Sequence, residues 1–106
     1  MSNQVGASHI LIMHKDSDRS SATRTKEQAL ELINEIKGKL DDGAEFSALA
    51  SENSDCPSGQ DGGNLGAFGP GQMVKPFEDA AFGLDVDATS DVVETDFGYH
   101  LIRRNA

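Results

Sequence analysis

The segment from Cys56 to Glu78 constrains the fold of this chain more than any other part of its sequence. Glycine recurs throughout the segment, and glycine adopts turn conformations that other residues reach only at a cost. Four apolar side chains lie between these glycines, namely Leu65, Phe68, Met73 and Phe77. Because turns separate them, we do not expect a flat helical stripe, and we predict that they line a concave apolar pocket. Such a pocket suits a proline ring.

The length and the hydropathy pattern indicate one domain. At 106 residues the chain is long enough to bury one core, so we expect residues 1–106 to form a single domain. We expect flexibility at residues 1–6 and in the polar, turn-rich loop 15–24. The hydrophobic content is 37% and long apolar runs are nearly absent, which excludes a membrane span.

The charge balance indicates which classes of binding partner to expect. Nine basic against eighteen acidic residues give a net charge of −9, which repels phosphate backbones and anionic lipids. Neither nucleic acid nor a membrane is therefore an expected partner. The acidity indicates a solvated surface, and selection of basic substrates is the alternative. The single cysteine and the absence of a signal-peptide pattern predict a cytoplasmic protein, and no apolar stripe left over from the core predicts a monomer.

Periodicity and turn residues predict an α+β fold in the order βαααβαββ, if a short turn after Cys56 counts as helical. Thr25 and Gln28 form a capping-box pattern at the start of a long helix that Gly43 stops. A glycine-bearing turn at 96–98 predicts a terminal hairpin. The predicted helices cover 25–43, 46–53 and 76–83, and the predicted strands cover 7–14, 65–68, 91–95 and 99–103.

The histidines are His9, His14 and His100. Strand side chains alternate between faces, so His9 and His14 face opposite sides of the first strand and cannot readily share a metal. With one cysteine there is no paired-ligand spacing for zinc, and neither a metal nor a cofactor is expected. If the first and last strands are neighbours, His9 and His100 can meet. Taken alone, such a buried pair is more often a structural contact than a catalytic one.

Five segments of the chain together resemble the parvulin family of peptidyl-prolyl cis/trans isomerases. They occur in the family's order and spacing, and the likeness covers about residues 7–104. The resemblance implies a four-stranded antiparallel sheet surrounded by helices and an isomerase activity. The segments are Ser8-His9-Ile10-Leu11-Ile12, Ser54-Asp55-Cys56-Pro57-Ser58-Gly59, Gly63-Asn64-Leu65-Gly66, Gly71-Gln72-Met73-Val74-Lys75-Pro76-Phe77 and Phe97-Gly98-Tyr99-His100.

The resemblance also implies roles for individual residues. His9 and His100 would be the paired central histidines, and Thr95 would join their hydrogen-bond network. Cys56 would be the polar active-site residue that many relatives replace with aspartate. The remaining implied site residues concern substrate binding: Leu65, Met73 and Phe77 would form the prolyl pocket, Phe68 and Phe97 would border it, and Gln72 would contact the substrate backbone.

The expected function is isomerisation of Xaa-Pro bonds in proline-containing peptides and in unfolded or partly folded proteins, as general folding assistance. Regulation of one particular partner is the narrower possibility. Alternatives from other classes are a thiol hydrolase using Cys56 and a non-catalytic holdase that only binds proline-containing segments. The pocket residues also have a structural interpretation, because Leu, Met and Phe fill ordinary cores.

The sequence disfavours specificity for phosphorylated substrates. The phosphate-directed branch of the family has a lysine on the first strand where this chain has Met13. The following loop contains basic residues, but Asp16 and Asp18 lie among them and would repel a phosphate dianion. The basic residues of this loop are Lys15, Arg19 and Arg24.

Overall fold

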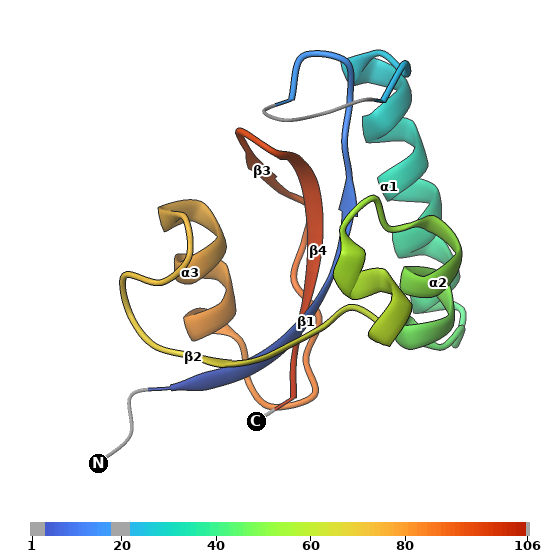
Figure 1. Ribbon diagram of the computed structural model, residues 1–106. Helices are drawn as coiled ribbons and strands as arrows, with labels where there is room; N and C mark the ends of the chain where they lie inside the picture. The colour runs from blue at the N-terminus through green and yellow to red at the C-terminus, as the bar shows by residue number, and fades with distance from the viewer. Residues whose placement is uncertain (1–3, 18–21, 106) are drawn as a thin grey trace.

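The computed structural model describes residues 4–17 and 22–105 and contains one four-stranded sheet in the order β2-β1-β4-β3 (Figure 1). All neighbouring strands are antiparallel, so the predicted α+β class, element order and sheet type are confirmed. No helix in the described part of the chain is long and apolar enough to span a membrane. The elements are β1 (Val5–Ile12), α1 (Lys26–Asp41), α2 (Phe46–Asn53), the 3-10 helix η1 (Pro57–Asp61), β2 (Asn64–Phe68), α3 (Lys75–Gly83), β3 (Val93–Thr95) and β4 (Gly98–Arg104).

Helix α1 begins with the predicted capping box. Thr25 Oγ1 accepts a hydrogen bond from the Gln28 amide at 3.1 Å, and Gln28 Oε1 accepts one from the Thr25 amide at 2.8 Å. Each bond satisfies an amide that has no partner within the helix. The helix ends at Asp41, and Gly43 follows it with a φ of +100°. The predicted helix was therefore right in kind and within two residues at its end.

The alternation of strand side chains divides the core into two clusters on opposite faces of the sheet. On one face, Ile10 and Ile12 of β1 pack with Ile33 and Ile36 of α1. On the other face, Ala7 of β1 and Ile102 of β4 belong to a cluster with α3. Figure 1 shows α1 and α2 on one side of the sheet and α3 on the other. Side chains in register with Ala7 and Ile102 therefore face α3.

Strand β1 lies two residues earlier in the chain than predicted. Val5 and Gly6 pair with Phe68 and Ala67 of β2, and Val5 is 2% exposed. The strand thus includes two residues that the sequence placed before it, and the expected flexibility of residues 1–6 stays a prediction. At its other end β1 stops at Ile12, where its ladder with β4 ends.

The structure describes only part of the loop that follows β1. Its described parts contain hydrogen bonds, such as that from the Lys15 amide to the Arg24 carbonyl at 2.9 Å. Residues 1–3 and 18–21, with Asp18 and Arg19 among them, lie outside the described residues. The predicted flexibility of loop 15–24 stays a prediction. Strand β3 is shorter than predicted, since only Val93–Thr95 pair with β4.

Gly63 brings the start of β2 against the middle of β1. Its φ is +84°, and a Cβ at this position would collide with the carbonyl oxygen of His9. The Gly63 carbonyl accepts a hydrogen bond from the His9 amide at 2.9 Å. Only glycine combines this backbone conformation with so close an approach. The glycine-rich segment thus holds the backbone at His9 in place.

Candidate active site

Strands β1 and β4 bring His9 and His100 together, as the alternation of side chains predicted. In the antiparallel register His9 is opposite Ile102 and His100 is opposite Leu11, so the two histidines are diagonal neighbours on one face. Their Nδ1 atoms are 3.1 Å apart, and their rings stack with centroids 5.3 Å apart. Exposure is only 5% for His9 and 4% for His100. The pair is a buried hydrogen-bonded unit in the centre of the sheet.

Burial keeps both imidazoles neutral. Removal from water lowers the pKa of His9 to about 4. The pKa of His100 falls to about 3, through burial and then through repulsion by His9. A neutral imidazole has one N–H donor and one acceptor nitrogen, so in the Nδ1–Nδ1 bond one ring donates and the other accepts. At neutral pH the site therefore offers oriented dipoles and no net charge.

Thr95 extends the histidine pair, as the resemblance implied. Its Oγ1 lies 2.7 Å from His100 Nε2 and accepts a hydrogen bond from the Phe97 amide at 3.1 Å. The chain of polar groups runs from the β3–β4 turn through Thr95 and His100 to His9. Phe97 is half-buried and contributes its backbone to this network. Its predicted place at the border of the prolyl pocket stays a prediction.

An apolar cluster lies against the histidine rings. The ring of Phe77 makes a T-shaped contact with each of them, with its centroid 5.5 Å from that of His9 and 5.3 Å from that of His100. The ring centroids of Phe68 and Phe77 are 6.0 Å apart, and Leu65 and Met73 pack on the same cluster. The structure therefore brings together the four apolar side chains that the sequence singled out. Phe68 and Phe77 are each 3% exposed and form the base, whereas Leu65 and Met73 are half-buried and can meet a substrate.

Gln72 lies in the exposed turn before α3. Its Oε1 accepts a hydrogen bond from the Gly69 amide at 2.6 Å, so this oxygen closes the turn. The predicted contact between Gln72 and the substrate backbone stays a prediction, for which its side-chain NH₂ group would be the donor.

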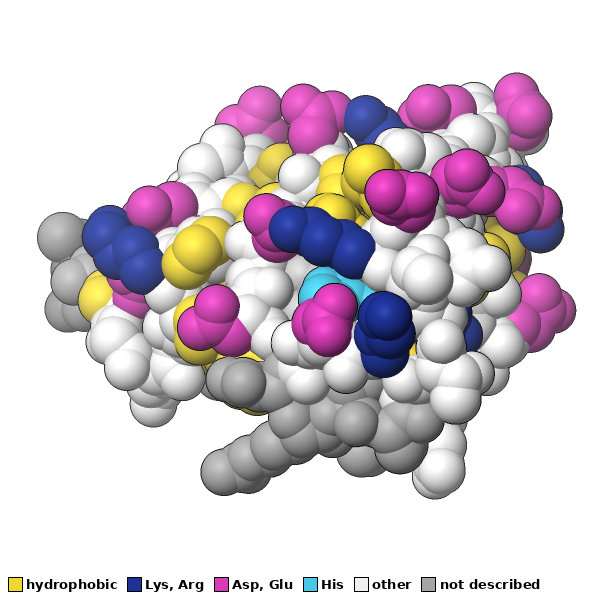
Figure 2. Space-filling model, turned by 90° about the horizontal axis from the view of Figure 1, so that it is seen from above, with side chains coloured by type: hydrophobic (Ala, Val, Ile, Leu, Met, Phe, Trp, Pro, Cys, Tyr) yellow, Lys and Arg dark blue, Asp and Glu magenta, His cyan; other side chains and the backbone are white. Residues whose placement is uncertain are grey.

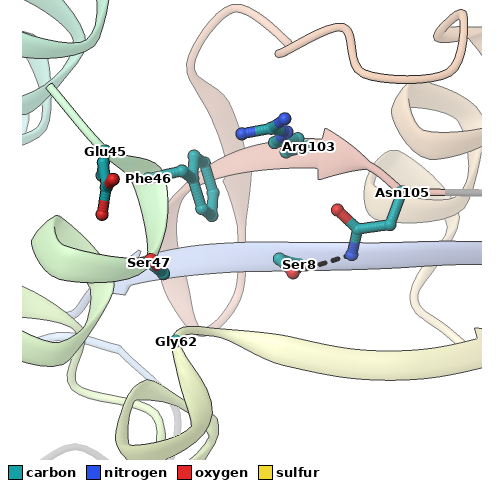
Figure 3. A pocket seen from close by; sticks show the side chains of 7 residues that line it. All are labelled: Ser8, Glu45, Phe46, Ser47, Gly62, Arg103 and Asn105. Atoms are coloured by element: carbon teal, nitrogen blue, oxygen red, sulfur yellow. Dashed lines mark hydrogen bonds between the residues drawn. The ribbon is translucent and has the colours of Figure 1, made fainter. Parts of the chain in front are cut away.

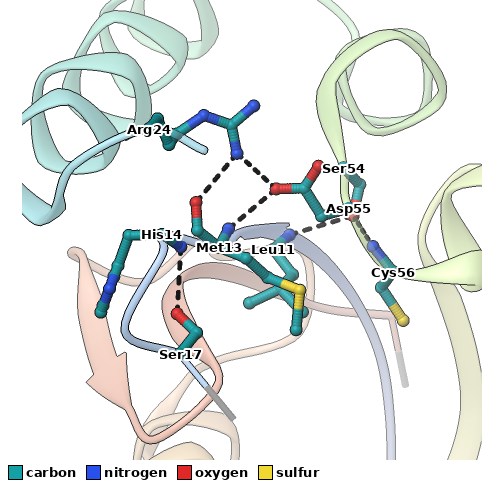
Figure 4. Close-up of polar contacts among 8 residues, drawn as sticks. All are labelled: Leu11, Met13, His14, Ser17, Arg24, Ser54, Asp55 and Cys56. Carbon is teal, nitrogen blue, oxygen red and sulfur yellow. Dashed lines mark hydrogen bonds and ion pairs between the residues drawn. The ribbon is translucent and has the colours of Figure 1, made fainter. Parts of the chain in front are cut away.

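Cys56 follows α2 on the short connection to η1. It is half-buried, and its amide lies 3.4 Å from Ser54 Oγ (Figure 4). A cavity of about 370 Å³ adjoins it, lined also by Ser51, Ser54, Asp55, Gly59 and Gln60. No role for Ser54 or Asp55 was expected from the sequence. Their place directly before Cys56 was the only signal that could have pointed to them.

A groove of about 790 Å³ has Thr95 in its lining, together with residues of the loop after β1, of α1 and of the segment before α3. Its charged lining consists of three carboxylates, Asp16, Glu94 and Asp96, and one ammonium group, Lys26. Lys26 Nζ lies 2.8 Å from Glu94 and lowers its pKa, so this carboxylate is ionised at neutral pH. Seen from above, acidic side chains are spread over the molecule, with Lys or Arg beside some of them (Figure 2). The groove next to the candidate site is therefore acidic.

Another cavity, of about 310 Å³, contains none of the predicted site residues (Figure 3). It adjoins Phe46, which belongs to the core cluster of α1 and α2. Asn105 Nδ2 donates a hydrogen bond to Ser8 Oγ at 2.8 Å along its wall. The other lining residues are Glu45, Ser47, Gly62 and Arg103. Within residues 4–17 and 22–105, no three His, Cys, Asp or Glu side chains are grouped as metal ligands.

Two features together are typical of one class of isomerase domains. The first is the small α+β fold, and the second is a neutral histidine pair packed against an apolar cluster. The chain belongs to the parvulin family of peptidyl-prolyl cis-trans isomerases, since the family model for the PPIC-type PPIase domain matches residues 1–105. It is an enzyme that isomerises Xaa-Pro peptide bonds, and proline-containing peptide segments are its substrates.

Named relatives agree with this assignment. The chain is 44% identical over 115 residues to the peptidyl-prolyl cis-trans isomerase Pin1 of Arabidopsis thaliana, covering 98% of this chain and 97% of that one. It is 46% identical over 101 residues to the foldase protein PrsA of Geobacillus kaustophilus, covering 94% of this chain and 31% of that one. The solved structure of the peptidyl-prolyl isomerase ESS1 from Candida albicans matches with a TM-score of 0.92 and 35% identity, covering 98% of this chain and 63% of that one.

Proposed function

We propose that this enzyme isomerises unphosphorylated Xaa-Pro bonds without a covalent intermediate, by holding the twisted amide beside the neutral pair of His9 and His100. The observation that carries the proposal is the 3.1 Å contact between the two buried Nδ1 atoms, whose rings both contact Phe77. The enzyme acts as a monomer in the cytoplasm on unfolded or partly folded proteins, giving general assistance to folding. Its net charge of −9 supports the further proposal that nucleic acid and membranes are not partners.

The chemistry requires no proton transfer or bond cleavage. Amide resonance opposes rotation by about 18–20 kcal/mol, and the uncatalysed step takes tens to hundreds of seconds. A million-fold acceleration needs only about 8 kcal/mol of preferential binding of the twisted amide. Leu65, Met73 and Phe77 hold the proline ring out of water in this scheme. The fixed dipoles of the histidine pair and Thr95 stabilise the twisted state at no cost of reorientation.

Cys56 acts through polarity in this scheme, and its replacement by aspartate tests that role. We expect Cys56→Asp to keep activity within about tenfold of the parent enzyme, because a carboxylate supplies a polar group but no thiolate nucleophile. Protease-free isomerisation of a prolyl peptide, followed by NMR exchange, measures the rate. Cys56→Ala serves as the control and should be less active than Cys56→Asp. A loss of a thousandfold or more in both variants would instead indicate obligatory attack by the thiolate.

The charges around the site support a preference for unphosphorylated substrates. A phosphate beside Thr95 would meet the carboxylates of Asp16, Glu94 and Asp96, and it carries about −1.5 to −2 charges at pH 7. Arg24, a loop residue whose guanidinium could otherwise bind a phosphate, already binds Asp55 and the Met13 carbonyl (Figure 4). Lys26 is paired with Glu94.

A matched pair of peptides tests this preference. We expect kcat/KM for a phosphoserine-proline peptide to be no higher than for the same peptide with serine, because like charges repel in the groove. Glu94→Gln with Asp96→Asn should raise the rate for the phosphorylated peptide several-fold and leave the other nearly unchanged. Raising the salt concentration should reduce the difference between the peptides. A hundredfold advantage for the phosphorylated peptide would overturn the proposal.

A further inference from the structure

Side chains continue the hydrogen-bond ladder of β1 beyond Asn64, the first residue of β2. The amides of residues 9, 11 and 13 point to the β2 edge, since alternate strand amides face the same side. The His9 amide binds the main-chain carbonyl of Gly63 at 2.9 Å. The Leu11 amide binds Ser54 Oγ at 3.0 Å, and the Met13 amide binds Asp55 Oδ2 at 2.8 Å. Ser54 and Asp55 thus supply the acceptors that a longer β2 would have supplied.

Arg24 completes this contact from a distant part of the chain. Its Nη1 donates to Asp55 Oδ2 at 2.6 Å and to the Met13 carbonyl at 2.9 Å (Figure 4). The side chains of Arg24 and Asp55 are only 30% and 28% exposed, so water screens this pair less than a fully exposed one. Arg24 directly precedes Thr25, the cap of α1. The contact therefore joins the start of α1, the end of β1 and the loop before Cys56.

These bonds hold the Cys56 loop at a defined place on β1. The Asp55 amide donates to the Leu11 carbonyl at 2.7 Å, so Leu11 binds the loop through both its amide and its carbonyl. Leu11 is the residue opposite His100 in the sheet. Helix α2 ends at Asn53 and η1 begins at Pro57, which leaves only the short connection 54–56 between them. Ser54 and Asp55 therefore tie the chain just before Cys56 to Leu11, and Leu11 is paired with His100 in the sheet.

We propose that Asp55 is a positioning residue for the isomerase reaction, which together with Ser54 and Arg24 sets Cys56 relative to the histidine pair. The proposal rests on the role proposed above for Cys56. Asp55 itself is engaged by Met13 and Arg24, and it acts through the loop and not through the substrate. Its loss should therefore lower kcat more than it changes KM.

The test compares Asp55→Ala and Asp55→Asn with Asp91→Ala. Asp91 is a matched control, because it also binds a cation at 2.6 Å, Lys37, but is 94% exposed in its side chain. We expect Asp55→Ala to lower kcat about tenfold with KM within about twofold. The rate at which Cys56 reacts with a neutral disulfide reagent should change at least about threefold, because the loop is released. Asp55→Asn keeps an acceptor for the Met13 amide and should recover at least half of the lost kcat.

Each outcome decides between a positioning role and a merely structural one. Asp91→Ala should leave kcat and the thiol rate unchanged. An unchanged thiol rate in Asp55→Ala, or a loss of kcat fully explained by the unfolded fraction, overturns the positioning role. If Asp55→Ala does not fold, the same readouts on Asp55→Asn decide, with about a twofold loss of kcat expected. If Cys56→Ala retains full activity, the role proposed for Cys56 is wrong, whatever the thiol rate in the Asp55 variants.

Discussion

Phe77→Ala is expected to lower kcat/KM for a prolyl peptide about a hundredfold and the free energy of unfolding by about 3 kcal/mol. Phe77 is 3% exposed, so its removal leaves a cavity in the cluster of α3. The same side chain makes T-shaped contacts with both histidine rings, so its removal should also loosen their packing. Stability is measured by urea denaturation and activity by exchange NMR, under conditions where the variant is folded.

Phe46→Ala is the matched control for this loss. Phe46 is as deeply buried, at 4% exposed, but packs in the cluster of α1 and α2 on the other face of the sheet. We expect a similar loss of stability from Phe46→Ala, with activity per folded molecule nearly unchanged. Met73→Ala adds a variant with a smaller stability cost, because Met73 is only half-buried. Equal losses of activity in Phe77→Ala and Phe46→Ala would mean that Phe77 has only a structural role in the core.

Acid is expected to destabilise the fold below about pH 6.5 because of the histidine pair. In the unfolded chain a histidine takes up its proton near pH 6.5, whereas the folded-state pKa is about 4 for His9 and about 3 for His100. Between these values the unfolded state binds more protons, so stability rises with pH. The stabilising contribution is complete above pH 6.5 and is lost as the pH falls toward 3. The slope of the free energy of unfolding against pH reaches at most about 1.4 kcal/mol per pH unit for each histidine.

Urea denaturation between pH 7.5 and 5.5 measures this effect above the range in which most carboxylates titrate. His9→Asn combined with His100→Asn should remove most of the slope in that window. The rate constant of isomerisation by the folded parent enzyme should stay nearly constant over the same range, since both rings remain neutral. Stability that is independent of pH from 7.5 to 5.5 would contradict the assignment of neutral, buried imidazoles.

Much of the site was predictable because its determinants are local. The capping box at Thr25 and Gln28 lies within one turn of helix, and it appears in the structure as predicted. The two-residue period of a strand placed His9 and His100 on compatible faces before their distance was known. The glycines around Leu65 and Met73 indicated that apolar side chains gather between turns, and these side chains share one cluster.

The contacts between distant segments were beyond sequence reasoning. The start of β1 at Val5 depends on pairing with Phe68, and the anchor of the Cys56 loop joins Arg24, Asp55 and Met13. The low pKa values of the histidines depend on burial by the assembled sheet and α3. The sequence by itself determined which elements form and which faces their side chains take, because helix caps, turns and strand periodicity act over a few residues. Only the tertiary structure decided the register, the burial and the ionic partners, because these are set by residues that meet across the whole chain.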